Sequence, residues 1–126
     1  MRTAFNRTNT TVFLDGTLTK YNFSGLLENV QDLIKMRRGE IIIDCTHLKL
    51  IDSLGLGTLI GLAENASRHG IKLYLIGLQH ATVAADATNE LKEHVIDKLD
   101  ISNKVKQAAN SGSDTPATST PIRKRI

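Results

Sequence analysis

Two stretches of this sequence end alike, in basic residues followed by glycine, and a short apolar run follows each at once. Residues 24–38 carry apolar side chains at helical spacing and end in Arg-Arg before Gly39. Residues 53–69 end in Arg-His before Gly70. Cations suit the negative end of a helix dipole, and glycine adopts the left-handed conformation that closes a helix. Each stretch is therefore predicted to be a helix that leads directly into a strand.

Three short runs are predicted to be strands: residues 11–18, 40–45 and 71–77. The run EIIIDC at 40–45 is apolar on both faces, as in a strand buried within a sheet. A polar turn is expected to join it to the helix at 53–69. The alternation of strands and helices predicts an α/β fold, a mixed sheet of four or five strands with helices packed on one side.

The chain after the third strand is predicted to return to helix over residues 82–109, with apolar residues on one side. Asp100 or Ser102 is expected to cap a last short helix that holds Val105. Sites in such folds form at the loops that leave the carboxyl ends of strands. Here that rule directs attention to residues 45–55.

The size and charge of the chain restrict its class. Its 126 residues allow one domain, expected over residues 1–110, and residues 111–126 are a Ser/Thr/Pro-rich basic tail predicted to be disordered. Residues 1–110 hold 13 Lys and Arg against 12 Asp and Glu, so the body lacks the basic stripe of a nucleic-acid binder. The single cysteine fits a reducing cytosol, and no apolar run is long enough to span a membrane. We expect a cytoplasmic protein with no nucleic-acid partner and no membrane insertion.

Two motifs suggest chemistry that their own residues do not support. The segment 13–19, FLDGTLT, resembles the DxDGTLT motif of haloacid-dehalogenase-type phosphatases, but Phe13 stands where the nucleophilic aspartate belongs. The glycines at 55, 57 and 61 miss the G-x-G-x-x-G dinucleotide fingerprint by one position. A hydrolase that uses Asp15 or Ser53 stays open only as a minor alternative.

The remaining reactive side chains give no metal or catalytic pattern. The four histidines, at 47, 69, 80 and 94, have no spacing typical of a triad or a metal site. Cys45 is predicted to be a buried strand residue instead of a reactive thiol. We expect no cofactor, no metal and no enzymatic activity.

The tetrapeptide Asp52-Ser53-Leu54-Gly55 lies between a predicted strand and a predicted helix, where Ser53 is a good N-cap. The surrounding segment, from EIIIDC to IKLYLIG, resembles the STAS domain (sulfate transporter and anti-sigma factor antagonist). Members of that family run from an apolar strand ending in Asp, through a loop, to Asp-Ser-x-Gly, a helix, a glycine and another apolar strand. The similarity covers residues 10–105, and the longer, Ala-rich residues 78–90 depart from it.

The resemblance implies a regulatory role without catalysis. Single-domain STAS proteins of bacteria commonly act in partner switching, where a serine kinase related to histidine-kinase ATPases phosphorylates the serine of Asp-Ser-x-Gly. A PP2C-type phosphatase removes the phosphate. The unmodified protein binds the kinase or anti-sigma factor, which frees a sigma factor or another target. Carried onto this chain, Ser53 is the phosphoacceptor. The alternative is a constitutive STAS subunit of a lipid ABC transporter or a stress-sensing complex.

Helical geometry predicts which face of the segment 53–69 a partner would meet. At about 100° per residue, one side of the helix faces the core, and its predicted members are Leu56, Leu59, Ile60, Ala63 and Ala66. The opposite stripe is predicted to hold Leu54, Thr58, Gly61 and Asn65. We expect partner contact at Leu54, Thr58 and Gly61 of this stripe, and the resemblance adds Asp52 and Gly55, the matched neighbours of Ser53.

Overall fold

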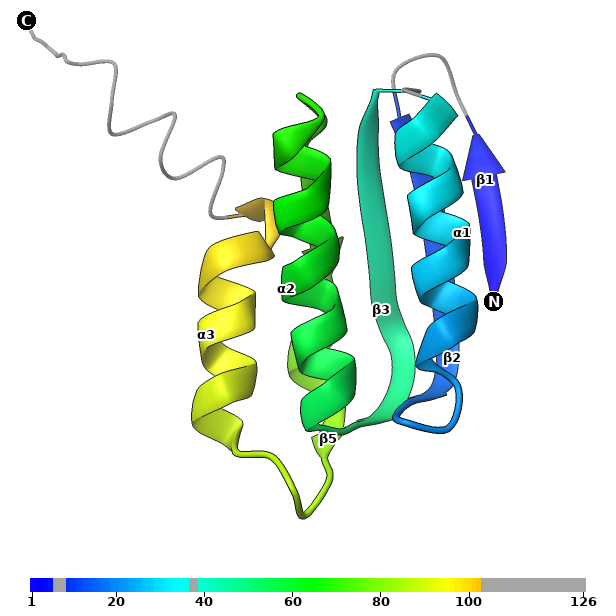
Figure 1. Ribbon diagram of the computed structural model, residues 1–126. Coiled ribbons are helices and arrows are strands. Elements are labelled where there is room, and N and C mark those ends of the chain that lie inside the picture. The colour runs from blue at the N-terminus through cyan, green and yellow to red at the C-terminus, as the bar shows by residue number, and fades with distance from the viewer. Residues whose placement is uncertain (6–8, 37–38, 103–126) are drawn as a thin grey trace, which may run out of the picture.

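The computed structural model describes residues 1–5, 9–36 and 39–102 (Figure 1). Five strands, three α-helices and one 3-10 turn make up this part of the chain. In chain order they are β1 (Arg2–Phe5), β2 (Asn9–Leu18), α1 (Phe23–Met36), β3 (Glu40–Ile51), α2 (Ser53–Arg68), β4 (Leu73–Ile76), η1 (Leu78–His80), β5 (Thr82–Val83) and α3 (Asn89–Leu99).

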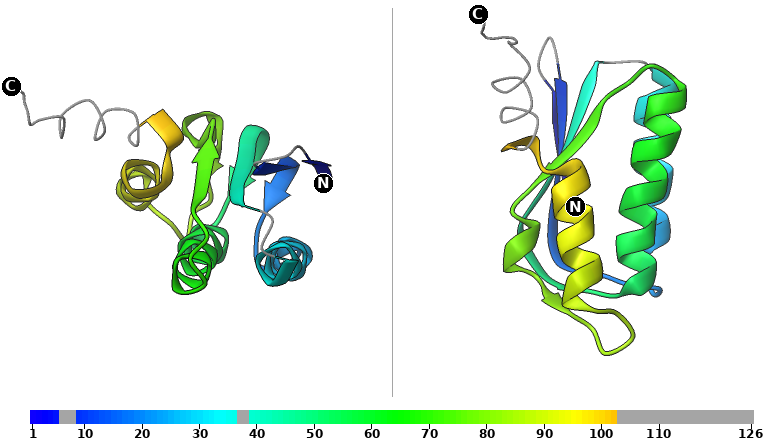
Figure 2. Two further views of the ribbon diagram at one scale, coloured as in Figure 1. Left: turned by 90° about the horizontal axis from the view of Figure 1, so that it is seen from above. Right: turned by 90° about the vertical axis from the view of Figure 1, so that its left-hand side faces the viewer.

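The strands form one mixed sheet in the order β1-β2-β3-β4, and β5 pairs with the far end of β3. β1 runs antiparallel to β2, and the other pairs are parallel. At the centre of the sheet Val12 pairs with Ile43, which pairs in turn with Leu75. α1 and α2 lie on the same side of the sheet, and α3 lies beside its β4 edge (Figure 2). This architecture confirms the predicted α/β fold.

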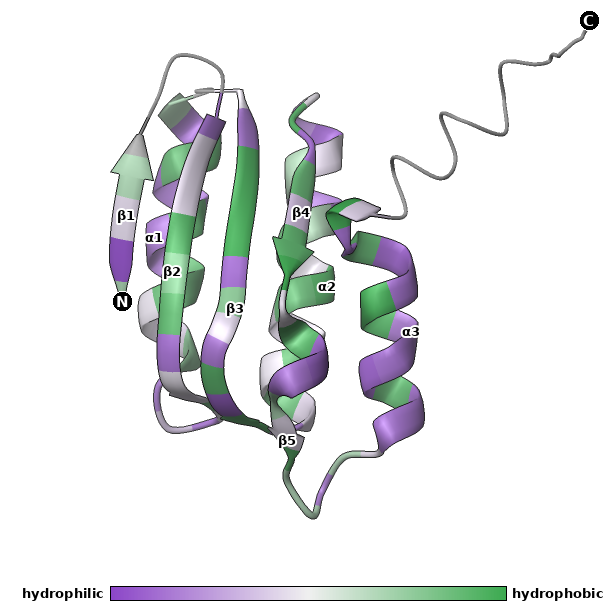
Figure 3. Cartoon of the chain, turned by 180° about the vertical axis from the view of Figure 1, so that it is seen from behind, coloured by the Kyte–Doolittle hydropathy of each residue, from purple (hydrophilic) through white to green (hydrophobic). Residues whose placement is uncertain are grey.

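The core lies between the sheet and this helical layer. Val12, Ile43 and Leu75 have no exposed surface, and α1 and α2 each bury a stripe of apolar side chains against them. Fully burying one such side chain stabilises a fold by about 1.5–3 kcal/mol. The opposite face of the sheet carries no helix (Figure 3). The alternating burial along β2 and β3 places both polar and apolar residues there, among them Thr11, Phe13, Ile42 and Asp44. The core is thus built on one side of the sheet only.

The glycines that follow α1 and α2 behave as predicted. α2 ends at Arg68, and the N–H groups of His69 and Gly70 bond to the carbonyls of Ala66 and Ser67 at 3.0 Å. Gly70 has a φ of 73° and Gly39 a φ of 89°, both in the left-handed region that favours glycine. Each glycine lets the chain reverse toward the next strand.

β3 is twice as long as predicted, and the expected polar turn after Cys45 does not exist. The strand continues to Ile51 because Leu48 and Ile51 face the core while their neighbours His47 and Lys49 face solvent. Its second half pairs with β2 on one side and with β5 on the other. The polar residues that suggested a turn are the solvent-facing residues of a strand whose side chains alternate between its two faces.

The prediction of a helix over residues 82–109 was wrong at its start. Thr82 and Val83 pair with β3, a loop follows, and α3 begins only at Asn89, where the side chain of Thr88 accepts the N–H of Leu91 at 3.1 Å. The position of this threonine cap sets the start of α3, although the alanines before it favour a helix. β1 is a further strand that the sequence pattern did not reveal.

Asp100 accepts hydrogen bonds from the N–H and Oγ of Ser102 at 2.8 and 2.6 Å. The last helix predicted around Val105 and the tail at 111–126 lie outside the described residues. Within the described ranges, no helix is long and apolar enough to cross a membrane.

Candidate functional site

Asp52 joins the end of β3 to the start of α2, and it is the N-cap of that helix. Its Oδ1 accepts the N–H of Gly55 at 2.8 Å, and its Oδ2 accepts the N–H of Lys20 at 2.8 Å. The side chain is buried, with only 5% of the residue surface exposed. Ser53, which the sequence predicted as the cap, is instead the first residue of the helix. Asp52 takes the cap because its two oxygens reach donors on two different segments.

Gly55 lies where α2 passes the end of β2. A Cβ atom placed on it would meet the carbonyl oxygen of Leu18 and would lie 2.8 Å from Cγ1 of Ile51. Asp52 is held at the same place, because its N–H donates to the carbonyl of Leu18 at 3.3 Å. The sequence assigned Asp52 and Gly55 to the partner surface, but the structure places both below it. Their observed contacts set the position of α2.

Ser53 is half-buried and makes two contacts with a loop that lies far away in sequence. Its Oγ donates to Oδ2 of Asp86 at 2.9 Å, and its N–H donates to Oδ1 of Asp86 at 3.2 Å. Sequence reasoning did not find Asp86. It lies in the Ala-rich stretch at 78–90, which carries no local motif.

The outward stripe of α2 begins beside Ser53. Leu54 is 42% exposed, one of the few large apolar residues that the described surface presents. Gly57 and Gly61 are exposed, and a Cβ on either would meet nothing within 4 Å. Thr58 is half-buried, and its Oγ1 donates to the carbonyl of Leu54 at 2.7 Å. Leu54, Gly57, Thr58 and Gly61 thus form an open strip of helix with one apolar side chain, which we call the α2 strip.

The inward face of α2 is close to the prediction. Leu56, Leu59 and Ala66 are buried as expected. Leu62, absent from the predicted set, is also buried, and Ile60 and Ala63 are half-buried at the edge of the core. The buried face of α2 is therefore rotated slightly toward Leu62 compared with the predicted face.

The other candidate side chains lie apart from Ser53, and Asp15, His47 and His80 line one hollow that does not include it. Cys45 is fully buried, as predicted, and burial together with the nearby charge of Asp44 raises the pKa of its thiol to about 12. Asp15 is exposed on β2, away from Ser53 on α2. Within the described residues no three His, Cys, Asp or Glu side chains converge to hold a metal ion.

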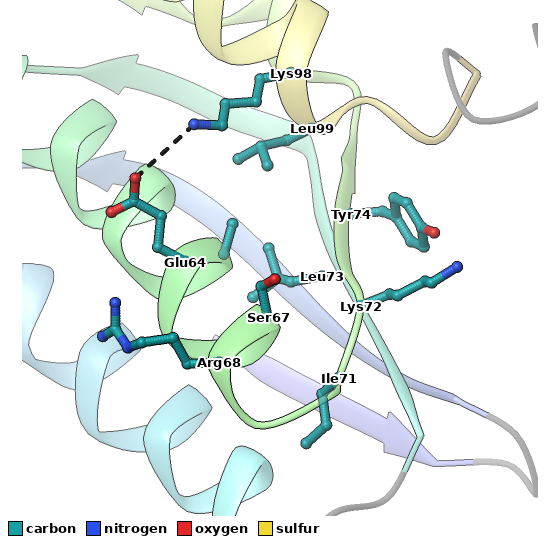
Figure 4. A pocket seen from close by; sticks show the side chains of 10 residues that line it. Glu64, Ser67, Arg68, Ile71, Lys72, Leu73, Tyr74, Lys98 and Leu99 are labelled. Atoms are coloured by element: carbon teal, nitrogen blue, oxygen red, sulfur yellow. Dashed lines mark ion pairs between the residues drawn. The ribbon is translucent and has the colours of Figure 1, made fainter. Parts of the chain in front are cut away.

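A hollow of about 630 Å³ lies near the other end of α2 (Figure 4). Its walls come from α2, the start of β4 and the end of α3, and Glu64 and Lys98 form an ion pair of 3.9 Å across it. The hollow does not include Ser53 or any residue of the α2 strip. The fold therefore separates it from the serine site.

The fold and this site define a class: a one-sided α/β domain with a serine at the first residue of the helix that follows the central strand. Comparison with family models places the chain in a particular family. The STAS domain model matches residues 1–108, and the chain belongs to that family. No curated protein matches the sequence.

Solved structures with the same fold include two of SpoIIAA. The unphosphorylated anti-sigma factor antagonist SpoIIAA is 18% identical with a TM-score of 0.52, and the match covers 77% of this chain and 94% of SpoIIAA. Phosphorylated SpoIIAA, a Bacillus cell fate determinant, is 15% identical with a TM-score of 0.51, with 75% and 97% covered. A crystal structure of Mglu has a TM-score of 0.54 at 13% identity over 60% of this chain, but the match spans only 19% of Mglu. At these identities the likeness is one of fold.

Proposed function

We propose that this chain is a non-enzymatic regulator, an anti-sigma factor antagonist-like protein that binds its partner while Ser53 is unphosphorylated. The partner is a serine kinase or anti-sigma factor of the histidine-kinase-like ATPase type, and a PP2C-type phosphatase restores the binding state. The setting is the cytoplasm, with no nucleic acid involved. The observation that carries the proposal is the place of Ser53, at the first position of α2 beside the exposed Leu54.

The N-terminus of α2 suits a phosphoryl group. The helix dipole favours negative charge there. The N–H groups of Ser53 and Gly55 already donate to Asp86 and Asp52, so a phosphate on Ser53 competes with Asp86 for the first of them. Ser53 stands at that end on a helix anchored by Asp52 and Gly55, so modification leaves the packing of the core in place. The phosphate adds about −1.5 to −2 charges next to an apolar contact residue. Binding is then lost through repulsion and desolvation, not through unfolding.

The α2 strip gives the partner a place to dock. Leu54 offers an apolar anchor, and the open positions at Gly57 and Gly61 let another surface approach the helix backbone. Thr58 lies between them with its hydroxyl satisfied by the helix. Asp52 and Gly55 support the strip from below, which is the role we assign to them in binding.

The test uses a candidate partner, a histidine-kinase-like serine kinase from the same organism, which is sought first among the neighbouring genes. The wild type and Ser53→Ala should bind it with similar affinity, and Ser53→Asp should bind at least tenfold more weakly with an unchanged circular dichroism spectrum. Ser24→Asp is the matched control, because it places the same charge on an exposed serine in the first turn of α1. Equal binding by all four proteins would reject the switch and favour a constitutive subunit of a transporter or stress-sensing complex.

A further inference from the structure

Asp86 lies on the loop between β5 and α3, and its two carboxylate oxygens both contact Ser53. Oδ2 accepts the Ser53 hydroxyl at 2.9 Å, and Oδ1 accepts the Ser53 N–H at 3.2 Å, across a separation of 33 residues. Within the described part of the chain, no cation lies at ion-pair distance from Asp86. The charge of this exposed carboxylate is therefore met by the serine and by the N-terminus of α2.

Hydrogen bonds hold the loop 84–88 at both of its ends and near its middle. At one end the N–H of Ala84 donates to the carbonyl of Ile51 at 2.9 Å, and at the other Thr88 caps α3. Between them the N–H of Ala87 closes a turn onto Ala84 at 3.0 Å. Among the described residues, the hydrogen bonds of the Asp86 side chain connect this turn to Ser53 of α2, and Ala87 packs against the core.

We propose that Asp86 is a latch that phosphorylation of Ser53 opens, so that the loop 84–88 becomes a second part of the switch. This inference rests on the proposed function of Ser53. Phosphorylation replaces the hydroxyl hydrogen, and the donor that Asp86 accepts is lost. The phosphate is an anion placed directly against the carboxylate, and its oxygens compete for the Ser53 N–H that Oδ1 now holds. Each of these three changes drives the carboxylate away from α2.

Opening the latch changes a larger part of the surface that a partner would contact. The loop leads into α3, which packs against α2, so a displaced loop alters the surface next to the α2 strip. The unmodified state presents Asp86 held flat against the helix end, and the modified state presents a phosphate with the loop detached. The two states then differ in shape as well as in charge.

The test needs no partner. Nitrogen-15-labelled protein is prepared with serine or with genetically encoded phosphoserine at position 53, and amide chemical shifts and hydrogen exchange are measured. Phosphoserine should move the amide signals of residues 84–88 and speed exchange at Ala87 roughly 2- to 10-fold, the equivalent of losing one hydrogen bond of about 0.5–1.5 kcal/mol. Unmodified Asp86→Ala should show the same loop changes, and phosphoserine should add little to them. Glu93→Ala, which removes an exposed acid from α3, is the control and should leave the loop as in the wild type.

Loop signals that ignore phosphoserine would overturn the latch, as would Asp86→Ala leaving the amide of Ser53 unmoved. If Asp86→Ala loses its circular dichroism spectrum, Asp86→Asn replaces it, because its amide oxygen accepts the Ser53 N–H and its NH2 group donates to the hydroxyl oxygen, with no charge. For that variant the latch predicts a wild-type loop before modification and a smaller displacement after it. A fixed loop with phosphorylation-sensitive partner binding would reject the latch alone, whereas a moving loop with insensitive binding would reject the proposed function.

Discussion

The carboxylate of Asp52 lies 2.8 Å from the backbone nitrogen of Lys20, a residue 32 positions earlier in the chain. This bond ties the start of α2 to the turn that follows β2. The other carboxylate oxygen caps α2 itself, so one buried side chain fixes both the end of the helix and its place on the sheet. Ser53 owes its defined position to this pair of contacts.

Replacing Asp52 should destabilise the domain. Asp52→Ala removes the helix cap and leaves the N–H of Lys20 without its acceptor, so we expect a loss of about 2 kcal/mol or more in the free energy of unfolding. Asp15→Ala removes an exposed carboxylate from β2 and should change it by no more than about 0.5 kcal/mol. Urea unfolding followed by circular dichroism measures both. Equal stability of the two variants would show that the Asp52 contacts contribute nothing.

The glycines of α2 should respond to alanine with opposite signs. Gly55→Ala places a methyl group against the carbonyl of Leu18, which should cost about 1–3 kcal/mol. Gly57→Ala and Gly61→Ala enter open space within a helix and should each stabilise by about 0.5–1 kcal/mol, because alanine is the better helix former. Thermal melts of the three variants decide the matter. A stabilising Gly55→Ala would mean that α2 sits further from β2 than described.

The fold was predictable wherever a local signal coincided with burial. The apolar stripes of α1 and α2 and the glycines at their ends gave both helices to within two residues over the described range. β3 was cut short because the His47 to Lys49 segment looks like a turn when its partners are unknown. Only the pairing of β3 with β2 and β5 shows that these polar residues face outward from a strand.

The site was predictable as a place but not as a set of contacts. Asp-Ser-x-Gly located the end of β3 and the start of α2 correctly. The assignment of Asp52 and Gly55 to the partner surface came from their place in the motif. A motif does not distinguish residues that hold the helix in position from residues that are exposed to a partner. Asp86 could not be found, because its contact with Ser53 is created by the path of a loop with no motif of its own.

The thiol of Cys45 should make stability fall at alkaline pH. Its pKa is raised from 9.0 to about 12 by burial and by Asp44, so the unfolded chain ionises the thiol before the folded one does. This contribution to the free energy of unfolding is complete below pH 9 and is lost as the pH rises toward 12, by about 1.4 kcal/mol per pH unit. Urea titrations of wild type and Cys45→Ala under reducing conditions should show their difference shrink over that range. A difference independent of pH would contradict the buried setting of the thiol.

The α2 strip should carry binding energy with little effect on the fold. Leu54→Ala should change the free energy of unfolding by no more than about 0.5 kcal/mol but weaken binding to the kinase by more than about 1 kcal/mol. Gly61→Arg should block docking by its bulk while the isolated helix stays intact. Calorimetric titration and thermal melts separate the two effects. Unfolding by Leu54→Ala would make Leu54 a core residue, and normal binding by Gly61→Arg would move the partner surface elsewhere.

The central claim is that the state of Ser53 decides whether a partner binds. Its most direct test is calorimetric titration of the candidate serine kinase, held with ADP, into this protein carrying either serine or phosphoserine at position 53. The account predicts clear binding to the serine form and at least a tenfold weaker affinity for the phosphoserine form, with unchanged circular dichroism. Equal affinity for the two forms would contradict it.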